Sequence, residues 1–270
     1  MYKKSHSKPE LPLVFVNEKG QKVSNPNQIT MKQHVIAQKH LEEWVAGDGR
    51  LTLREKDSKV FLRPTPYDAF RVERLWDQPM EAGTIKSTED KYQSVLDDFR
   101  LTGNLINHHL ITEYFVMLAA RAHCVTKHRP EGASMMDSPS RSPSKAELEA
   151  EELEHVNEPV RIISGFGTEQ HVSRFIVSQY LTTIYLRYVP RFGDCEWVAV
   201  PAQGGKFILP DSFWSFLTQG CLMMPANPDL ILLEKSIYQQ LADSGRLNTE
   251  ALNEMLMQTA RQHYVEPPTN

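Results

Sequence analysis

The sequence predicts an α+β fold, with long core helices packed on a small, mostly antiparallel sheet of hairpins. Apolar residues recur at helical spacing in two long stretches, residues 101–126 and 170–189. Short β-rich segments punctuated by glycine or proline gather near residue 55 and again after residue 195. Helices and strands are therefore grouped along the chain and do not alternate strictly, which favours α+β over a doubly wound parallel sheet.

The first elements predicted are a strand, a helix and a hairpin. A lone apolar cluster at residues 11–16 is consistent with one strand. Residues 29–45 are predicted to form a helix, because Thr30 is a suitable N-cap and the apolar residues share one broad side. Two short strands, residues 51–55 and 60–63, enclose a polar turn and are expected to form a hairpin.

The longest helical region is predicted for residues 88–127. Gly103 indicates two helices, or one helix with a weak point. A second core helix is predicted for residues 170–188, where apolar or aromatic residues recur at every fourth position. Pro190 is expected to end this helix.

The C-terminal third is expected to be rich in short strands. They are predicted at residues 197–201, 206–210, 221–225 and 229–233. Because Gly204 and Gly205 separate the first two, those strands are expected to form a hairpin. A final helix is predicted for residues 248–263.

We expect residues 30–265 to form one α+β domain after an N-terminal extension, residues 1–29. A flexible acidic insertion is predicted at residues 130–157. Six acids, with no Lys or Arg among them, lie between Glu147 and Glu158, and the residues before them show no apolar periodicity. A solvated linker is the first interpretation of the insertion, and contact with a protein partner is the alternative.

Composition argues against several classes of protein. The chain has 270 residues and a formal net charge of −4, which does not support a protein that coats nucleic acid, although a local basic patch stays open. The longest apolar run, residues 114–120, is far shorter than the roughly 20 residues of a membrane span. No secretory signal is expected. Cys124, Cys195 and Cys221 are widely spaced, which fits a cytoplasmic location and predicts neither a disulfide nor a structural zinc site.

Three polar residues have positions that suit chemistry as well as structure. Arg121 directly follows the most apolar stretch, so its guanidinium needs a carboxylate, phosphate or carbonyl partner. Asp211 follows the strand predicted at residues 206–210, where it either caps the next segment or holds a reacting group rigidly. His34, near the start of the first predicted helix, is either a general base or a surface or capping residue.

Spacing suggests one weak pair of metal ligands, His109 and Glu113, four residues apart on one helix face. A third protein ligand is usual for a divalent metal, and none is obvious nearby. The cofactor therefore stays unknown, with a divalent metal as one option. The sequence contains no Walker A loop, nucleophile elbow or His-Glu-x-x-His motif.

Several short motifs occur in a fixed order along the chain. They are Gln33-His34-Val35-Ile36 with Trp44, the hairpin that begins at residue 49, the helix that ends in Arg121, the segments 197–200 and 207–211, and Asn253 in the last helix. Together they cover about residues 30–265 and resemble domain-of-unknown-function family 4238. Around Asp211 the sequence departs from the family pattern, since Pro210 replaces a serine and the following proline is missing.

The resemblance implies an intracellular, bacterial α+β protein associated with phage-linked loci. It also implies that His34, Arg121, Asp211 and Asn253 approach one another. The first interpretation is that these residues form a buried hydrogen-bonded network that fixes the fold, in a protein whose biochemical role the sequence does not determine. Whether the protein is an enzyme stays undecided.

The alternative is a phosphodiester hydrolase, a nuclease-like effector in a phage-defence or toxin setting. His34 is then the general base or acid, Arg121 stabilises charge on the phosphate, and Asp211 orients His34 or holds a metal. This hypothesis expects His34 and Asp211 to meet at one edge of the sheet. It also implies a nucleic-acid partner, which the net charge does not support.

Overall fold

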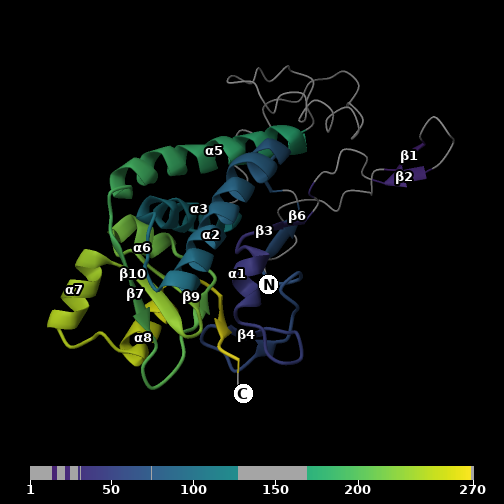
Figure 1. The fold of residues 1–270 in the computed structure, drawn as a ribbon. Coiled ribbons are helices and arrows are strands. Elements are labelled where there is room, and N and C mark those ends of the chain that lie inside the picture. Colours follow the sequence, from purple (N-terminus) through teal and green to yellow (C-terminus); the bar gives the residue numbers. More distant parts are fainter. Residues whose placement is uncertain are drawn as a thin grey trace.

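The structure is a computed structural model that describes residues 14–16, 22–24, 30, 32–73, 75–126 and 169–268. It confirms the α+β class, because long helices are combined with several small antiparallel sheets (Figure 1). The predicted insertion at residues 130–157 and most of the N-terminal extension lie outside the described residues. Within the described part of the chain, no helix is long and apolar enough to cross a membrane.

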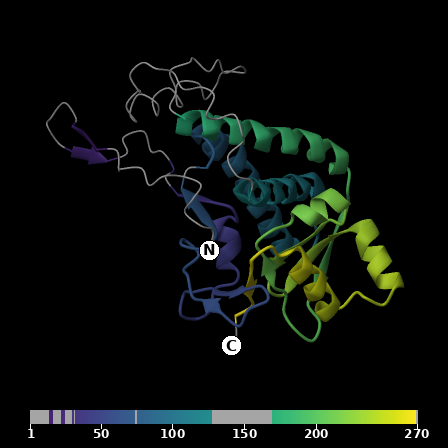
Figure 2. The ribbon, with the colours of Figure 1, turned by 180° about the vertical axis from the view of Figure 1, so that it is seen from behind.

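Helix α3 (His108–Thr126) is the centre of the helical layer. Residues 114–120 of this helix are all completely buried, which explains why the sequence is apolar on every side there. Helix α5 (Glu169–Phe192) lies along α3 in Figures 1 and 2, and α2 (Lys86–Thr102) packs against α3 as well. The predicted core helices therefore pack chiefly on each other.

Two of the predicted helix ends can be compared with the structure. Gly103 follows α2 with a φ of 72°, a left-handed conformation that glycine adopts without strain, so residues 88–127 form two helices. The prediction that Pro190 ends α5 is wrong, because the helix continues to Phe192. Pro190 lies in the last turn, where its missing N–H removes a single intrahelical hydrogen bond.

A four-stranded antiparallel sheet joins the two ends of the described chain. Its strands, in spatial order, are β5 (Phe61–Leu62), β4 (Thr52–Glu55), β11 (His263–Glu266) and β8 (Leu209–Pro210). The predicted hairpin is confirmed as β4 and β5. The predicted last helix is shorter than expected, because α8 (Thr249–Thr259) ends before the chain enters β11.

A three-stranded antiparallel sheet has the order β7 (Trp197–Pro201), β10 (Leu230–Glu234) and β9 (Met223–Asn227). The hairpin predicted across Gly204 is wrong, because β7 pairs with β10 and β8 pairs with β11. Pro210 has no N–H to donate, which limits the pairing of β8. Helix α6 (Trp214–Gln219) precedes β9, and α7 (Lys235–Asp243) follows β10 at the outer edge in Figure 1.

The helix predicted at residues 29–45 is wrong over its first half. Strand β3 (Lys32–His34) pairs with β6 (Arg71–Glu73), and only α1 (Gln38–Glu42) is helical. A π-helix, η2 (Met80–Ile85), then leads into α2. A further hairpin is formed by β1 (Val14–Val16) and β2 (Lys22–Ser24).

Candidate functional site: the Arg121 cluster

Arg121 connects three elements of the fold. Its side chain is only 1% exposed on α3. One guanidinium nitrogen, Nη1, donates to Glu89 Oε1 of α2 at 2.6 Å and to the backbone carbonyl of His34 in β3 at 3.0 Å. Glu89 is 25% exposed, so this polar group reaches solvent on the α2 side. Arg121 was predicted to need a carboxylate, phosphate or carbonyl partner, and the structure shows a carboxylate and a carbonyl.

The other edge of the same guanidinium is the unusual feature. Arg121 Nε and Nη2 are buried, and no residue in the described part of the chain accepts a hydrogen bond from either. A buried donor without an acceptor typically costs 1–3 kcal/mol. These two nitrogens form the planar edge with which arginine binds both oxygens of a carboxylate or phosphate. The donor pattern of this edge therefore suits an oxyanion, and the edge is buried in this structure.

His34 lies beside Arg121 with a ring nitrogen available. The tip of its ring, Nε2, is 3.1 Å from the carbonyl oxygen of Tyr67. A carbonyl only accepts, so Nε2 carries the proton and Nδ1 keeps its lone pair. Burial, the largest effect, lowers the pKa of His34, opposed by the Tyr67 hydrogen bond and the charge of Glu89. His34 is therefore a neutral imidazole at neutral pH, the form that accepts a proton.

Glu81 is the fourth member of the cluster, and it lies in the π-helix η2. The indole nitrogen of Trp76 donates to its Oε2 at 2.6 Å. Burial raises the pKa of Glu81 from 4.5 to about 7, while the Trp76 hydrogen bond and the Arg121 charge act in the opposite direction. A carboxyl group that is half protonated near pH 7 can donate or accept a proton. We call Arg121, Glu89, His34 and Glu81 the Arg121 cluster.

A buried glutamine fixes the geometry around Glu81. Gln33 is completely buried; its amide nitrogen donates to the Trp76 carbonyl at 2.8 Å, and its amide oxygen accepts from the Trp76 N–H at 3.1 Å. Trp76 is thus held through its backbone by β3 and through its indole by Glu81. Gln33 therefore positions Glu81 through Trp76, and the adjacent residue, His34, is the second proton-transferring group of the cluster.

The structure places Asp211 and Asn253 elsewhere. The Asp211 carboxylate, 1% exposed after β8, accepts hydrogen bonds from three backbone N–H groups between α8 and β11, at 2.7–3.0 Å. The amide of Asn253 on α8 bonds to the backbone of residues 206 and 208. The predicted meeting of His34 and Asp211 is wrong, because the Tyr67 carbonyl occupies the place of the orienting acceptor and Asp211 binds a backbone turn.

The two proposed metal ligands, His109 and Glu113, are not part of a larger group of metal-binding side chains among the described residues. His109 is exposed on α3, and Glu113 acts on Tyr185, whose pKa rises to about 12 chiefly through burial and then through the Glu113 charge. Among the described residues, no group of three or more His, Cys, Asp or Glu side chains is arranged to hold a metal ion. The arrangement of His109 and Glu113 thus gives no support to metal binding.

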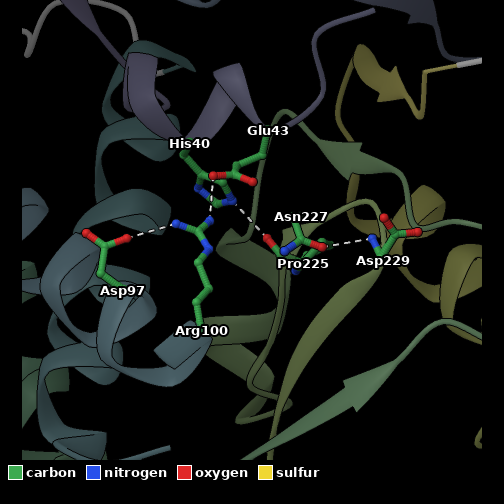
Figure 3. Close-up of polar contacts among 7 residues, drawn as sticks. All are labelled: His40, Glu43, Asp97, Arg100, Pro225, Asn227 and Asp229. Carbon is green, nitrogen blue, oxygen red and sulfur yellow. Dashed lines mark hydrogen bonds and ion pairs between the residues drawn. The ribbon is translucent and has the colours of Figure 1, made fainter. Parts of the chain in front are cut away.

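His40 is a second histidine near the cluster, but both of its ring nitrogens are engaged. Nε2 is 2.8 Å from the carbonyl oxygen of Pro225, as Figure 3 shows, and Nδ1 is 2.9 Å from the Tyr114 hydroxyl. The carbonyl must accept, so Nε2 donates and Nδ1 accepts from Tyr114. Burial lowers the pKa of His40 to about 4. This histidine is a neutral link between α1 and β9 and has no lone pair left for catalysis.

The remaining polar contacts in Figure 3 are local, within one element or between neighbouring ones. Arg100 at the end of α2 contacts Glu43 at 2.6 Å and Asp97 at 2.9 Å, with 42% of its own side chain exposed. Such exposed pairs contribute little to stability. The Asp229 N–H donates to the Asn227 side chain in the turn between β9 and β10. These contacts do not leave a buried donor without an acceptor, and in this they differ from Arg121.

Sequence reasoning found two members of the Arg121 cluster and missed two. The sequence singles out His34 and Arg121, which are 87 positions apart in the chain, and Arg121 donates to the His34 backbone carbonyl. Glu81 and Glu89 were missed, because nothing in their local spacing distinguishes them from the other acids of the same region. Glu81 lies in a π-helix, and no periodicity in the sequence predicts that element.

Comparison of the chain with protein-family models, with curated proteins and with solved structures finds no match. The resemblance to family 4238 therefore stays a prediction.

Proposed function

We propose that the Arg121 cluster binds a phosphodiester and hydrolyses it. The observation that carries the proposal is the buried guanidinium edge of Arg121, whose Nε and Nη2 have no acceptor among the described residues. Two parallel N–H groups match two oxygens of a phosphate. Electrostatic stabilisation of this kind is worth most in a site from which water is excluded.

The charge of the cluster favours a diester over a monoester. Arg121 supplies one positive charge, and Glu89 offsets much of it at 2.6 Å. A phosphodiester carries a single negative charge, whereas a monoester carries nearly two at neutral pH. The second charge of a monoester would meet the carboxylate of Glu89, so the diester is the better-matched substrate.

The pKa shifts of His34 and Glu81 favour the protonation states that hydrolysis requires. Neutral His34 accepts a proton from water at Nδ1 as the water oxygen attacks phosphorus. Protonated Glu81 gives its proton to the leaving oxygen as the phosphorus–oxygen bond breaks. The products are a phosphomonoester and an alcohol, and the two proton transfers balance.

Turnover of bis(p-nitrophenyl) phosphate tests the proposal, with p-nitrophenyl phosphate as the monoester control and with EDTA, Mg²⁺ or Mn²⁺ in parallel. We expect Arg121→Lys to lower diester turnover about 100-fold, because lysine keeps the charge and loses the bidentate edge. Arg100→Lys, an exchange of the same kind at an exposed ion pair, is expected to leave turnover unchanged.

His34→Ala separates chemistry from structure at the same position. The variant keeps the backbone carbonyl that binds Arg121 and removes only the imidazole. We expect it to lose activity while its thermal melt stays close to that of the wild type. The proposal is wrong if the wild type turns over no diester under any of these conditions, or if folded Arg121→Lys is fully active.

A second candidate is a network that serves only to hold β3 against α2 and α3. The hydrogen bonds that Gln33 makes with Trp76, and those that Arg121 makes with β3 and α2, favour it. This candidate predicts that Arg121→Lys lowers the melting temperature of a protein that has no hydrolytic activity.

A nuclease-like effector in a phage-defence or toxin setting is the biological role that fits the hydrolase, and it is proposed on that ground alone.

A further inference from the structure

The β3–β6 ribbon has one buried face and one polar face. Gln33 and Val72 are opposite each other and almost completely buried. Side chains alternate between the two faces of a strand, so Lys32, His34 and Arg71 take the other face. Three basic side chains therefore share the outer face of this ribbon.

An exposed tyrosine lies against this face. Tyr67 is 47% exposed. The centroid of its ring lies 6.1 Å from the centroid of the His34 ring. Lys32 Nζ lies 4.7 Å from the ring centroid, and the Arg71 guanidinium carbon lies 5.5 Å from it. The Tyr67 carbonyl is the acceptor for His34, so the ring adjoins the Arg121 cluster.

Each cation next to Tyr67 has an acidic residue as a neighbour. Arg71 contacts Asp68 at 2.9 Å, and the strand pairing sets Glu73 opposite Lys32. The Lys32 ammonium group packs on the ring. An exposed aromatic ring flanked by cations provides a stacking surface for a base and contacts for the phosphates next to it.

We infer that the face formed by Tyr67, Lys32 and Arg71 binds single-stranded nucleic acid, with a base on the ring and the adjacent phosphodiester at the Arg121 cluster. This inference rests on the proposed function and names its substrate class. A single strand is required because the bases of a duplex are already stacked on each other.

Binding of short fluorescein-labelled oligonucleotides tests the inference by anisotropy, in EDTA and at about 50 mM salt. The oligonucleotides are single-stranded DNA, single-stranded RNA and duplex DNA of the same sequence. We expect Tyr67→Ala to weaken single-strand binding about tenfold and Tyr67→Phe to bind like the wild type, because the ring is what stacks. Phe61→Ala removes another exposed aromatic ring, 58% exposed on β5, and is expected to have no effect.

Lys32→Gln provides a second measurement that does not depend on the ring. It is expected to weaken binding a few-fold and to reduce the slope of log affinity against log salt by about 0.7, the loss of one phosphate contact. Binding of either the DNA or the RNA strand supports the inference, and the stronger of the two identifies the sugar that is preferred.

Two results would overturn the inference. One is that the protein binds duplex DNA as tightly as single strands, and the other is that Tyr67→Ala and Phe61→Ala bind single strands with the same affinity. Turnover of bis(p-nitrophenyl) phosphate by the wild type is measured separately. If turnover is present and Tyr67 has no effect on strand binding, the inference fails while the proposed function stands. If strand binding depends on Tyr67 and turnover is absent, the hydrolase proposal fails and the binding face stands.

Discussion

Glu81 makes a specific prediction about pH, because burial raises its pKa from 4.5 to about 7. Between those values the folded protein keeps a proton that the unfolded chain releases. The free energy of unfolding therefore falls as pH rises through this window, by about 3 kcal/mol in total from this one group. Glu81→Gln has no proton to lose and retains an oxygen that can accept from Trp76.

Urea denaturation of wild type and Glu81→Gln at about pH 5 and about pH 8 measures this contribution. We expect the wild type to lose about 2–3 kcal/mol more stability than the variant between the two conditions. Parallel behaviour of the two proteins would show that Glu81 titrates normally and would remove the proposed general acid.

We expect substitution of Asp211 to lower the stability of the protein and to leave hydrolysis unaffected. Its carboxylate accepts three backbone hydrogen bonds in a buried turn. Asp211→Asn turns one acceptor into a donor that faces N–H groups, so we expect a loss of about 3 kcal/mol and a melting temperature lower by roughly 6–12 °C. Asp90→Asn, on the exposed surface of α2, is the matched control and is expected to melt like the wild type. An unchanged melt for Asp211→Asn would contradict this structural role.

Strand β3 depends on one polar side chain for its attachment. Gln33→Ala leaves the buried N–H and C=O of Trp76 without the glutamine partners they have in the wild type. We expect a loss of about 2–4 kcal/mol, since each unpaired buried group costs about 1–3 kcal/mol. Gln38→Ala removes the same side chain from the exposed face of α1, where it contacts only Glu42, and is expected to change stability by less than about 0.5 kcal/mol. Equal urea midpoints for the two variants would contradict the role of Gln33.

A comparison of individual elements shows why some could be predicted from the sequence and others could not. α3 is buried on nearly every side and α5 buries one face against it, so the apolar pattern of each long segment is enough to predict a helix. The segment that contains β3 has the apolar spacing of a helix, yet Lys32–His34 pairs with Arg71–Glu73. The pairing of β7 with β10 likewise depends on residues about 30 positions away. Local patterns carry no information about such distant partners.

At the scale of the whole molecule, the fold gathers the Arg121 cluster from three separate segments. β3 brings His34, the region from η2 to α2 brings Glu81 and Glu89, and α3 brings Arg121. Asp211 and Asn253 belong instead to the layer formed by β8, α8 and β11. The sequence indicated which residue types could carry chemistry, and only the packing of α2 and α3 against β3 decides which of them meet.

The central claim is that the free edge of Arg121 binds a phosphodiester. The most direct measurement is the ¹⁵N–¹H NMR spectrum of the arginine Nε–H groups during titration with diethyl phosphate, with the Arg121 signal identified by its loss in Arg121→Lys. We expect this signal to move to higher proton frequency and to saturate, while the Arg100 signal stays in place. An Arg121 Nε–H signal that does not move at any concentration of the diester would contradict the account.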